Sequence, residues 1–183
     1  MNYSFPSADA KALGYLKPQV DEFVELARVQ FADSSLELVT SNLIRNTEFD
    51  LIAGGYLVSA VDTAMDRLED AFAAREVQRQ KLFRGEFAVT DRLERVTEIV
   101  RGRLQRPKGK RFSRVNYLYR GYDKKQVDKL CLLIENHLSQ KEPLQINTIR
   151  RSIFKAKRGG YVESQVDAFI DRVVEILQIE KNR

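Results

Sequence analysis

The sequence has no tryptophan, one cysteine, one histidine and only four prolines among its 183 residues. A single cysteine, Cys131, excludes an internal disulfide, and a single histidine, His137, excludes a metal site built from several His and Cys ligands. This composition, with nine glycines, is typical of an α-helical protein. Because 43% of the residues are apolar, the chain can bury a core, and its length predicts one or two domains.

Long apolar runs are also missing. A membrane-spanning helix needs about 20 consecutive apolar residues, and no stretch of the sequence approaches that length. The N-terminal residues do not combine a charged start with an apolar segment, as a secretory leader does. We therefore expect a cytoplasmic protein without a signal peptide or a membrane span.

The residue types that enzymes use are scattered. His137 stands in a predicted helix without an acid or nucleophile to share a site with it. Cys131 lies on the apolar stripe of the same helix, where burial suppresses thiol reactivity. The glycine pairs at 54–55 and 159–160 lack the further glycines and the lysine of a nucleotide-binding loop. The sequence predicts no enzyme activity, no cofactor and no metal.

Charge is distributed unevenly along the chain. Residues 1–82 contain 8 Lys/Arg and 13 Asp/Glu, whereas residues 83–183 contain 23 and 13, for a total net charge of +5. The stretch 101–125 alone contains ten basic residues and one acidic residue. This asymmetry indicates an acidic partner for the second half, namely an anionic membrane, a nucleic acid or the first half of the same chain. A solvated basic connector is the alternative interpretation.

One pattern occurs four times in the sequence: Gly-Tyr, four variable residues, then Val-Asp. A repeat of this kind predicts one structural unit that is used several times. We number the occurrences copies 1 to 4. They consist of Gly14, Tyr15, Val20 and Asp21; Gly55, Tyr56, Val61 and Asp62; Gly121, Tyr122, Val127 and Asp128; and Gly160, Tyr161, Val166 and Asp167.

The four copies form two pairs. Their tyrosines are separated by 41, 66 and 39 residues, so the largest gap lies between copies 2 and 3. Twelve residues around copy 2 recur around copy 4 at a constant offset of 105. We infer a duplicated pair and predict three regions: a first pair at 1–82, a helical spacer with a basic connector at 83–111, and a second pair at 112–183.

Each copy reads as the start of a helix. In copy 3, Asp123 is placed to be the N-cap, Gln126 to reach back to it in a capping box, and Tyr122 to pack on Val127 as a hydrophobic staple. The glycine supplies a permissive backbone for a sharp entry. The Asp that ends the motif lies near the positive end of the helix dipole. The motif residues are therefore predicted to be helix-start architecture, and any local function is expected in the loop tips beside them.

Amphipathic patterns extend from every copy. Apolar residues recur at helical spacing after each Val-Asp, and a one-sided helix needs a partner. Shorter helices are predicted before copies 2 and 4, at about 34–47 and 143–153, and a spacer helix at about 90–105 follows a break at Gly85. The expected fold is all-α, with four helix-loop-helix repeats arranged as a duplicated pair with short coiled-coil-like packing.

The motif resembles the N-terminal domain of the DivIVA family of bacterial septum and pole scaffolds. A Phe, then Arg-Gly-Tyr-Asp, then Val-Asp and a helix carry the likeness, which is strongest from Tyr119 to Asp128. Four such units in pairs, over nearly the whole chain, resemble the DivIVA-domain repeat proteins of actinobacteria. The resemblance implies a role in cell division or polar growth, with an apolar residue and an Arg before Gly-Tyr that bind anionic membrane.

Carried onto this sequence, the membrane-binding tip corresponds to Tyr119 and Arg120 in copy 3 and to Lys157, Arg158 or the neighbouring Gly159 in copy 4. In copies 1 and 2 it corresponds to Ala12 and Leu13 and to Ala53 and Gly54. Copies 1 and 2 lack the Arg, so their loops depart from the family pattern. The neighbouring basic cluster adds Arg111 and Arg114 as candidate membrane-binding or partner-binding residues. The family's long downstream coiled coil is not among these 183 residues, which favours an adaptor over a polymerising scaffold.

Three functions are compatible with the sequence. The first is a non-enzymatic adaptor of bacterial cell division or cell-envelope growth, which binds a protein of that machinery and lies peripherally on the inner face of the cell membrane. The second is a helical protein-binding module without membrane contact. The third, less favoured because no nucleic-acid-binding motif is present, is a basic nucleic-acid-binding protein. The repeats are expected to pair within the chain or between two chains as a homodimer.

Overall fold

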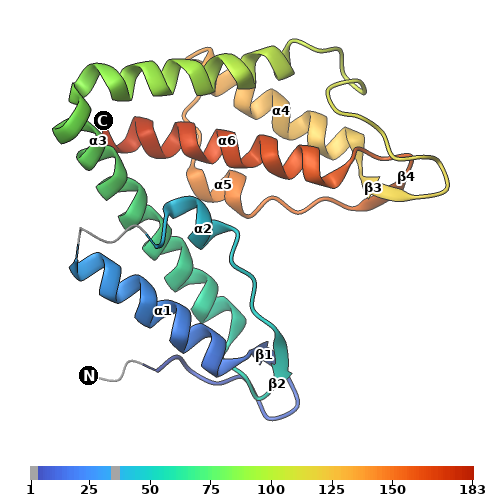
Figure 1. The fold of residues 1–183 in the computed structure, drawn as a ribbon. Coiled ribbons are helices and arrows are strands. Elements are labelled where there is room, and N and C mark those ends of the chain that lie inside the picture. The colour runs from blue at the N-terminus through green and yellow to red at the C-terminus, as the bar shows by residue number, and fades with distance from the viewer. Residues whose placement is uncertain (1–3, 34–37) are drawn as a thin grey trace. The chain divides into compact units, whose positions relative to one another are not determined.

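A computed structural model describes residues 4–33 and 38–183 (Figure 1). The chain divides into two compact units, unit 1 up to Glu76 and unit 2 from Val77 to Arg183. The boundary falls inside one long helix, α3 (Val58–Leu104). The boundary that the sequence predicted, after residue 82, lies within the same helix.

Unit 1 contains copies 1 and 2. Its elements are β1 (Leu13–Tyr15), α1 (Lys17–Ala32), α2 (Ser41–Arg45), β2 (Leu51–Ala53) and the first part of α3. Strands β1 and β2 pair antiparallel. One core cluster surrounds the two motifs and consists of Phe5, Val20, Tyr56 and Val61, and a second consists of Ala27, Val39, Ile44 and Phe72.

Unit 2 repeats this plan with copies 3 and 4. Its elements are the rest of α3, then β3 (Arg120–Tyr122), α4 (Lys124–Leu138), α5 (Ile146–Arg150), β4 (Ala156–Arg158) and α6 (Glu163–Asn182). Strands β3 and β4 pair antiparallel at the N-terminal ends of α4 and α6 (Figure 1). A single larger core joins α3, α4, α5 and α6 through residues such as Val100, Ile134, Ile149 and Val173.

The all-α prediction is wrong. The described residues form six helices and two small antiparallel sheets, so the chain is mixed α/β. Each sheet uses the Gly-Tyr of one copy and the residues just before the Gly-Gly-Tyr of its pair mate, with Gly14 opposite Ile52 and Gly121 opposite Lys157. The predicted unit of four helix-loop-helix repeats is therefore replaced by two strand-linked pairs, in which the loops before the helices are partly β-strand.

The motif glycines are required for close backbone approach. None of the four has a positive φ, so the predicted need for a permissive turn does not explain them. A Cβ atom built on Gly121 would lie 2.2 Å from the carbonyl oxygen of Tyr161, and one on Gly14 would lie 2.4 Å from that of Tyr56. Any side chain at these positions would push the two copies of a pair apart.

The predicted helix starts are confirmed, with a different role for the glutamine. Asp123 is the N-cap of α4 and accepts from the Lys125 amide at 3.0 Å. Gln126 does not reach back to the cap; its Oε1 accepts from the Lys155 amide at 2.7 Å, just before β4. Gln19 does the same for the amide of Asp50 at 2.8 Å. The glutamine therefore ties the first copy of each pair to the second.

The short helices are shorter than predicted. The segment 34–47 contains α2, only five residues long, and its residues 34–37 lie outside the described part of the chain. The segment 143–153 contains α5, also of five residues. The predicted break at Gly85 is confirmed, because that residue alone is non-helical inside α3, and the spacer helix ends at Leu104.

Candidate functional site at the tip of the second sheet

The tyrosine and aspartate of the motif bond between copies. In unit 1, the Tyr15 hydroxyl donates to Asp62 at 3.0 Å, and the Tyr56 hydroxyl donates to Asp21 at 3.0 Å. Each tyrosine thus reaches the aspartate of the other copy. The Asp is therefore placed to accept a hydroxyl and does more than complement a helix dipole.

Unit 2 contains the same crossed arrangement. The Tyr161 hydroxyl donates to Asp128 at 3.1 Å, and burial, together with the nearby Asp167 carboxylate, raises the pKa of the Tyr122 hydroxyl. The valines of all four motifs are buried, with exposed fractions of 1% or less. The motif residues consequently hold each pair of copies together, a role that the sequence did not predict beside the helix starts, and none of them forms an open site.

The motif tyrosines of unit 2 are expected to make the protein less stable at alkaline pH. Burial first, and then the partner carboxylate, raises the pKa of Tyr122 and of Tyr161 to about 12. An unfolded tyrosine ionises near pH 10. The free energy of unfolding is therefore highest below pH 10 and falls as the pH rises from 10 to 12. For the fully buried Tyr161 the loss is on the order of 2–3 kcal/mol.

Urea unfolding followed by circular dichroism at pH 9 and pH 11.5 measures this loss. Tyr161→Phe is expected to be about 1 kcal/mol less stable than the parent at pH 9 and to show a smaller fall between the two pH values. Lysines also lose charge in this pH range. An equal fall in the free energy of unfolding in parent and variant would therefore contradict the assignment of the loss to Tyr161.

The tip of the second sheet exposes three large side chains in a row. Tyr117, Leu118 and Tyr119 are 73%, 81% and 68% exposed. They form a turn that leads into β3, closed by the Tyr119 amide donating to the Asn116 carbonyl at 2.8 Å. The Asn116 side chain accepts from the Leu118 amide at 3.1 Å. The loop is thus shaped by its backbone and Asn116, while its three apolar side chains face solvent.

Unit 1 provides a comparison with the same backbone. Its turn is closed by the Ala12 amide donating to the Asp9 carbonyl at 2.8 Å, and Gly54 bonds Ala12 as Gly159 bonds Tyr119. The side chains at the three tip positions are those of Ala10, Lys11 and Ala12. The fold therefore does not require large apolar residues there. Of the two units, only unit 2 has large apolar residues at these three positions.

Arginines flank the apolar tip. Arg120 and Arg158 lie directly opposite each other in the register of β3 and β4, and both are exposed. Neither forms an ion pair with any residue in the described part of the chain. Like charges directly opposite each other in a two-stranded sheet are destabilising. The pair is consequently placed where an external anion would relieve the repulsion.

Lys157 is partly engaged at the same tip. Its Nζ lies 3.2 Å from the Asp123 carboxylate. The Lys125 amide, and then Lys157, lower the pKa of that carboxyl. About half of the Lys157 side chain is exposed, so it contributes positive charge beside the arginines while it supports the cap of α4.

The structure places the other two candidate residues in structural roles. Arg111 is 3% exposed, and its guanidinium lies 3.8 Å from Asp128 and 3.7 Å from Glu135. Arg114 donates to the Gly109 carbonyl at 2.8 Å and so closes the turn of the basic connector. Arg111 is therefore not available to a surface partner, whereas Arg114 stays exposed while it closes this turn.

Sequence reasoning missed Tyr117 and Leu118. The sequence contains a signal that could have found them. When the two pairs are aligned at an offset of 107, Tyr117, Leu118 and Tyr119 align with Ala10, Lys11 and Ala12. Exposed apolar residues where the paired repeat has small or charged ones indicate a function beyond folding.

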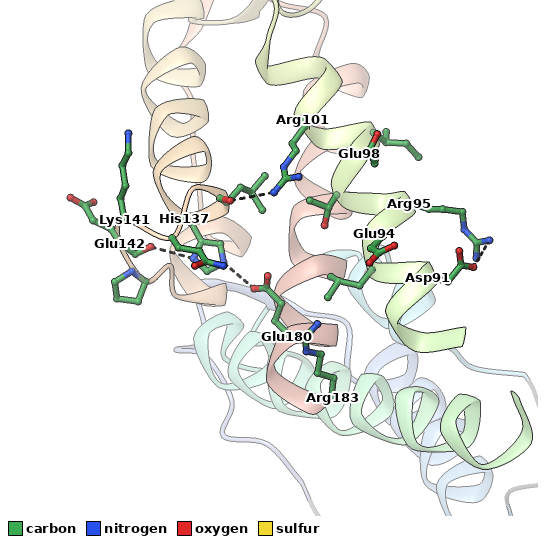
Figure 2. Close-up of a pocket in the computed structure, with 16 residues that line it drawn as sticks. Asp91, Glu94, Arg95, Glu98, Arg101, His137, Lys141, Glu142, Glu180 and Arg183 are labelled. Atoms are coloured by element: carbon green, nitrogen blue, oxygen red, sulfur yellow. Dashed lines mark hydrogen bonds and ion pairs between the residues drawn. The ribbon is translucent and has the colours of Figure 1, made fainter. Parts of the chain in front are cut away.

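A polar groove in unit 2 is lined by charged side chains of both signs. It is an open groove of about 1240 Å³ between α3, the end of α4 and the end of α6 (Figure 2). His137 lies 2.9 Å from Glu180 and 3.3 Å from the Glu142 carbonyl, while Arg95 pairs with Asp91 at 2.7 Å. No cluster of three His, Cys, Asp or Glu side chains able to hold a metal occurs in residues 4–33 and 38–183. The groove shows no catalytic arrangement.

The two units differ strongly in charge. Unit 1 contains 6 Lys/Arg and 13 Asp/Glu, for −7, and unit 2 contains 25 and 13, for +12. None of the helices in the described residues is both long and apolar enough to cross a bilayer. Comparisons with family models, with curated proteins and with solved structures found no match to this chain.

Proposed function

We propose that this chain is a non-enzymatic adaptor that attaches to anionic membrane surfaces through the tip of unit 2. The observation that carries the proposal is the exposed Tyr117, Leu118 and Tyr119 beside Arg120 and Arg158. The equivalent tip of unit 1 has two alanines and a lysine on the same backbone. An exposed apolar protrusion with adjacent cations has the two features that reversible membrane attachment needs.

The expected affinity is modest. Each Lys or Arg near an anionic surface contributes about 1 kcal/mol, so the two arginines and Lys157 together contribute about 3 kcal/mol. Tyrosine prefers the membrane interface because its ring is apolar and its hydroxyl is polar. Burying the leucine adds roughly 1.5–3 kcal/mol. The sum supports reversible, salt-sensitive binding that depends on both the apolar and the basic residues.

The cellular setting rests on the resemblance to the DivIVA family. Arg120, Gly121, Tyr122 and Asp123 match the Arg-Gly-Tyr-Asp of that family, and the resemblance implies that the residues just before Gly-Tyr bind membrane. We place the adaptor in bacterial cell division or cell-envelope growth. It would lie at the cytoplasmic face of the cell membrane, where anionic lipid is exposed, and bind a protein of that machinery.

A protein-binding module without membrane contact is the second candidate. It is favoured by Leu13, Leu51 and Ile52 on the sheet of unit 1, which are 62%, 54% and 47% exposed on an acidic unit. A partner with apolar residues inside a basic rim would complement them. Nucleic acid is less favoured, because no nucleic-acid-binding motif is present and Arg111 is buried within the chain.

Vesicle co-sedimentation tests the proposal. The parent is expected to bind vesicles containing phosphatidylglycerol and not pure phosphatidylcholine. Replacing the tip by its unit 1 counterpart, with Tyr117→Ala, Leu118→Lys and Tyr119→Ala, adds a positive charge and is still expected to abolish most binding. Arg120→Glu changes two charges and is expected to weaken binding by about 2 kcal/mol, or roughly 30-fold.

Arg28→Glu is the charge-matched control. Arg28 is exposed on α1 in unit 1, far along the sequence from the tip. It makes the same change in net charge and is expected to leave vesicle binding nearly unchanged. Equal weakening by Arg28→Glu and Arg120→Glu, or full binding by the tip replacement, would contradict a role for the tip. Absence of parent binding to any vesicle would favour the protein-binding module.

A further inference from the structure

One residue separates two helical stretches of unit 2. Gly85 has φ 79° and ψ 166° inside α3, and the residues on both sides are helical. A Cβ atom at this position would meet nothing within 4 Å. The turn is therefore set by the backbone conformation of one glycine, without steric demand from its surroundings.

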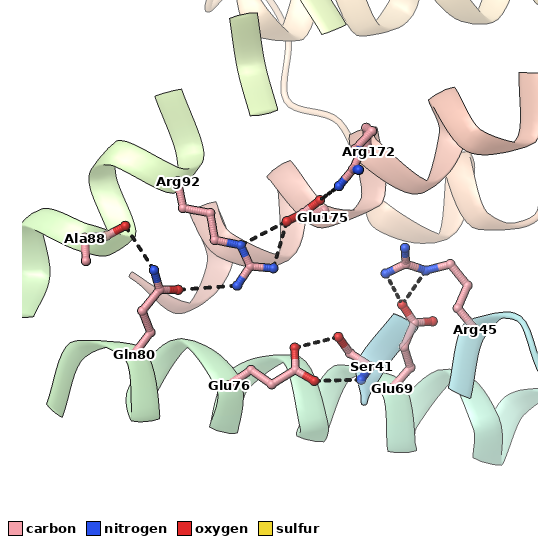
Figure 3. Close-up of polar contacts among 9 residues, drawn as sticks. All are labelled: Ser41, Arg45, Glu69, Glu76, Gln80, Ala88, Arg92, Arg172 and Glu175. Atoms are coloured by element: carbon pink, nitrogen blue, oxygen red, sulfur yellow. Dashed lines mark hydrogen bonds and ion pairs between the residues drawn. The ribbon is translucent and has the colours of Figure 1, made fainter. Parts of the chain in front are cut away.

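The two stretches contact each other across this turn. The Gln80 side chain donates to the Ala88 carbonyl at 3.0 Å and accepts from Arg92 at 3.3 Å (Figure 3). Val77, on the first stretch, is buried in the same core as Val89 on the second. These contacts join residues 77–84 to the helix at 86–104, and all lie within unit 2.

Three large apolar side chains lie largely exposed at the turn, and the Arg79 guanidinium lies 5.8 Å from the centre of one of them, the Phe83 ring. Leu82, Phe83 and Phe87 are 83%, 79% and 85% exposed. In a helix continued straight through Gly85, the two phenylalanines would be four residues apart and share one face. The turn thus exposes residues that a straight α3 would align along one side.

We infer that Gly85 is a hinge for exchange between two copies of this chain. In the exchanged dimer, which is the minor state of the parent at micromolar concentration, the second copy covers these residues. In the exchanged dimer α3 runs straight, and residues 77–84 of each copy pack on the helix 86–104 of the other. The Gln80 and Val77 contacts of the monomer are remade between copies. Phe83 and Phe87 of the two straight helices then face each other where the helices cross.

Size argues for exchange over simple docking of two patches. A phenylalanine buries about 150–250 Å², so the three exposed side chains together offer roughly 400–500 Å². A stable interface needs about 800 Å² per partner. Exchange adds the contacts of residues 77–84, which the monomer already makes. A short hinge between two helices is also a common route to exchanged dimers.

Light scattering after size-exclusion chromatography tests the inference with Gly85→Ala. Alanine disfavours the positive φ of the turn and favours a straight helix. The parent is expected to be mainly monomer at micromolar concentration and Gly85→Ala mainly dimer. Gly102→Ala is the matched control, since Gly102 is also exposed in α3 with open space around it. It is expected to stay monomeric, and a monomeric Gly85→Ala at all concentrations would overturn the inference.

Cross-linking separates exchange from docking. Cysteines introduced by Gln80→Cys and Arg92→Cys, in a Cys131→Ala background, are close across the turn. In a straight helix these positions are about 18 Å apart. A short bis-maleimide is therefore expected to join two chains covalently in the Gly85→Ala dimer and to link within one chain in the monomer. A dimer that shows only links within a chain would refute exchange.

The exposed residues supply an independent readout. Leu82→Ser, Phe83→Ser and Phe87→Ser together are expected to leave the monomer folded by circular dichroism and to lower the dimer fraction of Gly85→Ala at least tenfold. An unchanged dimer fraction would overturn the role of these residues. Loss of binding to phosphatidylglycerol vesicles in the triple variant, with no effect on dimerisation, would instead assign them to the membrane.

Discussion

Gly121→Ala is expected to lower the free energy of unfolding of unit 2 by about 3–5 kcal/mol. The new Cβ would lie 2.2 Å from the Tyr161 carbonyl oxygen, and the obstacle is backbone. Relief requires copies 3 and 4 to separate, which breaks the paired bonds between Tyr122 and Tyr161 at 3.0 and 2.9 Å. The change should be visible as lost hydrogen-exchange protection at these two amides.

Unit 1 is the internal reference for this experiment. The amides of Tyr15 and Tyr56 make the corresponding bonds and should keep their protection in Gly121→Ala. Gly102→Ala, in open helix, is expected to be neutral or slightly stabilising. Because the chain has no tryptophan, NMR-detected exchange is better suited than fluorescence. Undiminished protection of the Tyr122 and Tyr161 amides would show that the strands tolerate a side chain.

Asp128→Ala is expected to lower the free energy of unfolding of unit 2 by about 3–5 kcal/mol. Asp128 accepts from the Tyr161 hydroxyl at 3.1 Å and from the Gly109 amide at 2.8 Å, and it faces the buried Arg111. Without it, the Arg111 guanidinium retains Glu135, whose side chain is half exposed, as its ion-pair partner in the described chain. Urea unfolding followed by circular dichroism measures the loss.

Asp21→Ala is the matched variant in unit 1. Asp21 accepts from the Tyr56 hydroxyl in the same way, but the position that corresponds to Arg111 is Ser4. Its removal is expected to cost only about 1 kcal/mol, the value of one hydrogen bond. If the two aspartate variants lost the same stability, the buried arginine could not be the cause of the Asp128 effect.

The repeats and helix starts could be predicted because their signals are local. A motif of eight residues places the cap, the staple valine and the helix in one window, and Asp123 is the cap that it predicts. The sheets could not be read in this way. Three-residue strands are too short to show an alternating pattern of apolar and polar residues. In addition, β1 pairs with residues 51–53, and the two central residues of this pair, Gly14 and Ile52, are 38 positions apart in the sequence.

The site was predicted in part for the same reason. The resemblance named Tyr119 and Arg120 in one loop and Arg158 in another, but it did not predict that they meet, because the pairing of β3 with β4 is what brings them to one tip. The burial of Arg111 was not predictable from the basic run around it. It depends on Asp128, which the fold of the connector brings to the same place.

The crossed tyrosine bonds follow the rule of a two-fold interface. The hydroxyl of Tyr15 in copy 1 donates to the aspartate of copy 2, and the hydroxyl of Tyr56 in copy 2 donates to the aspartate of copy 1. The glycine of each copy likewise lies against the backbone of the other copy. A surface that pairs by reciprocity is complementary to itself. One copy alone leaves a hydroxyl and a carboxylate unmatched, so the smallest self-sufficient piece of this architecture is two copies, joined in one chain or brought together as a homodimer.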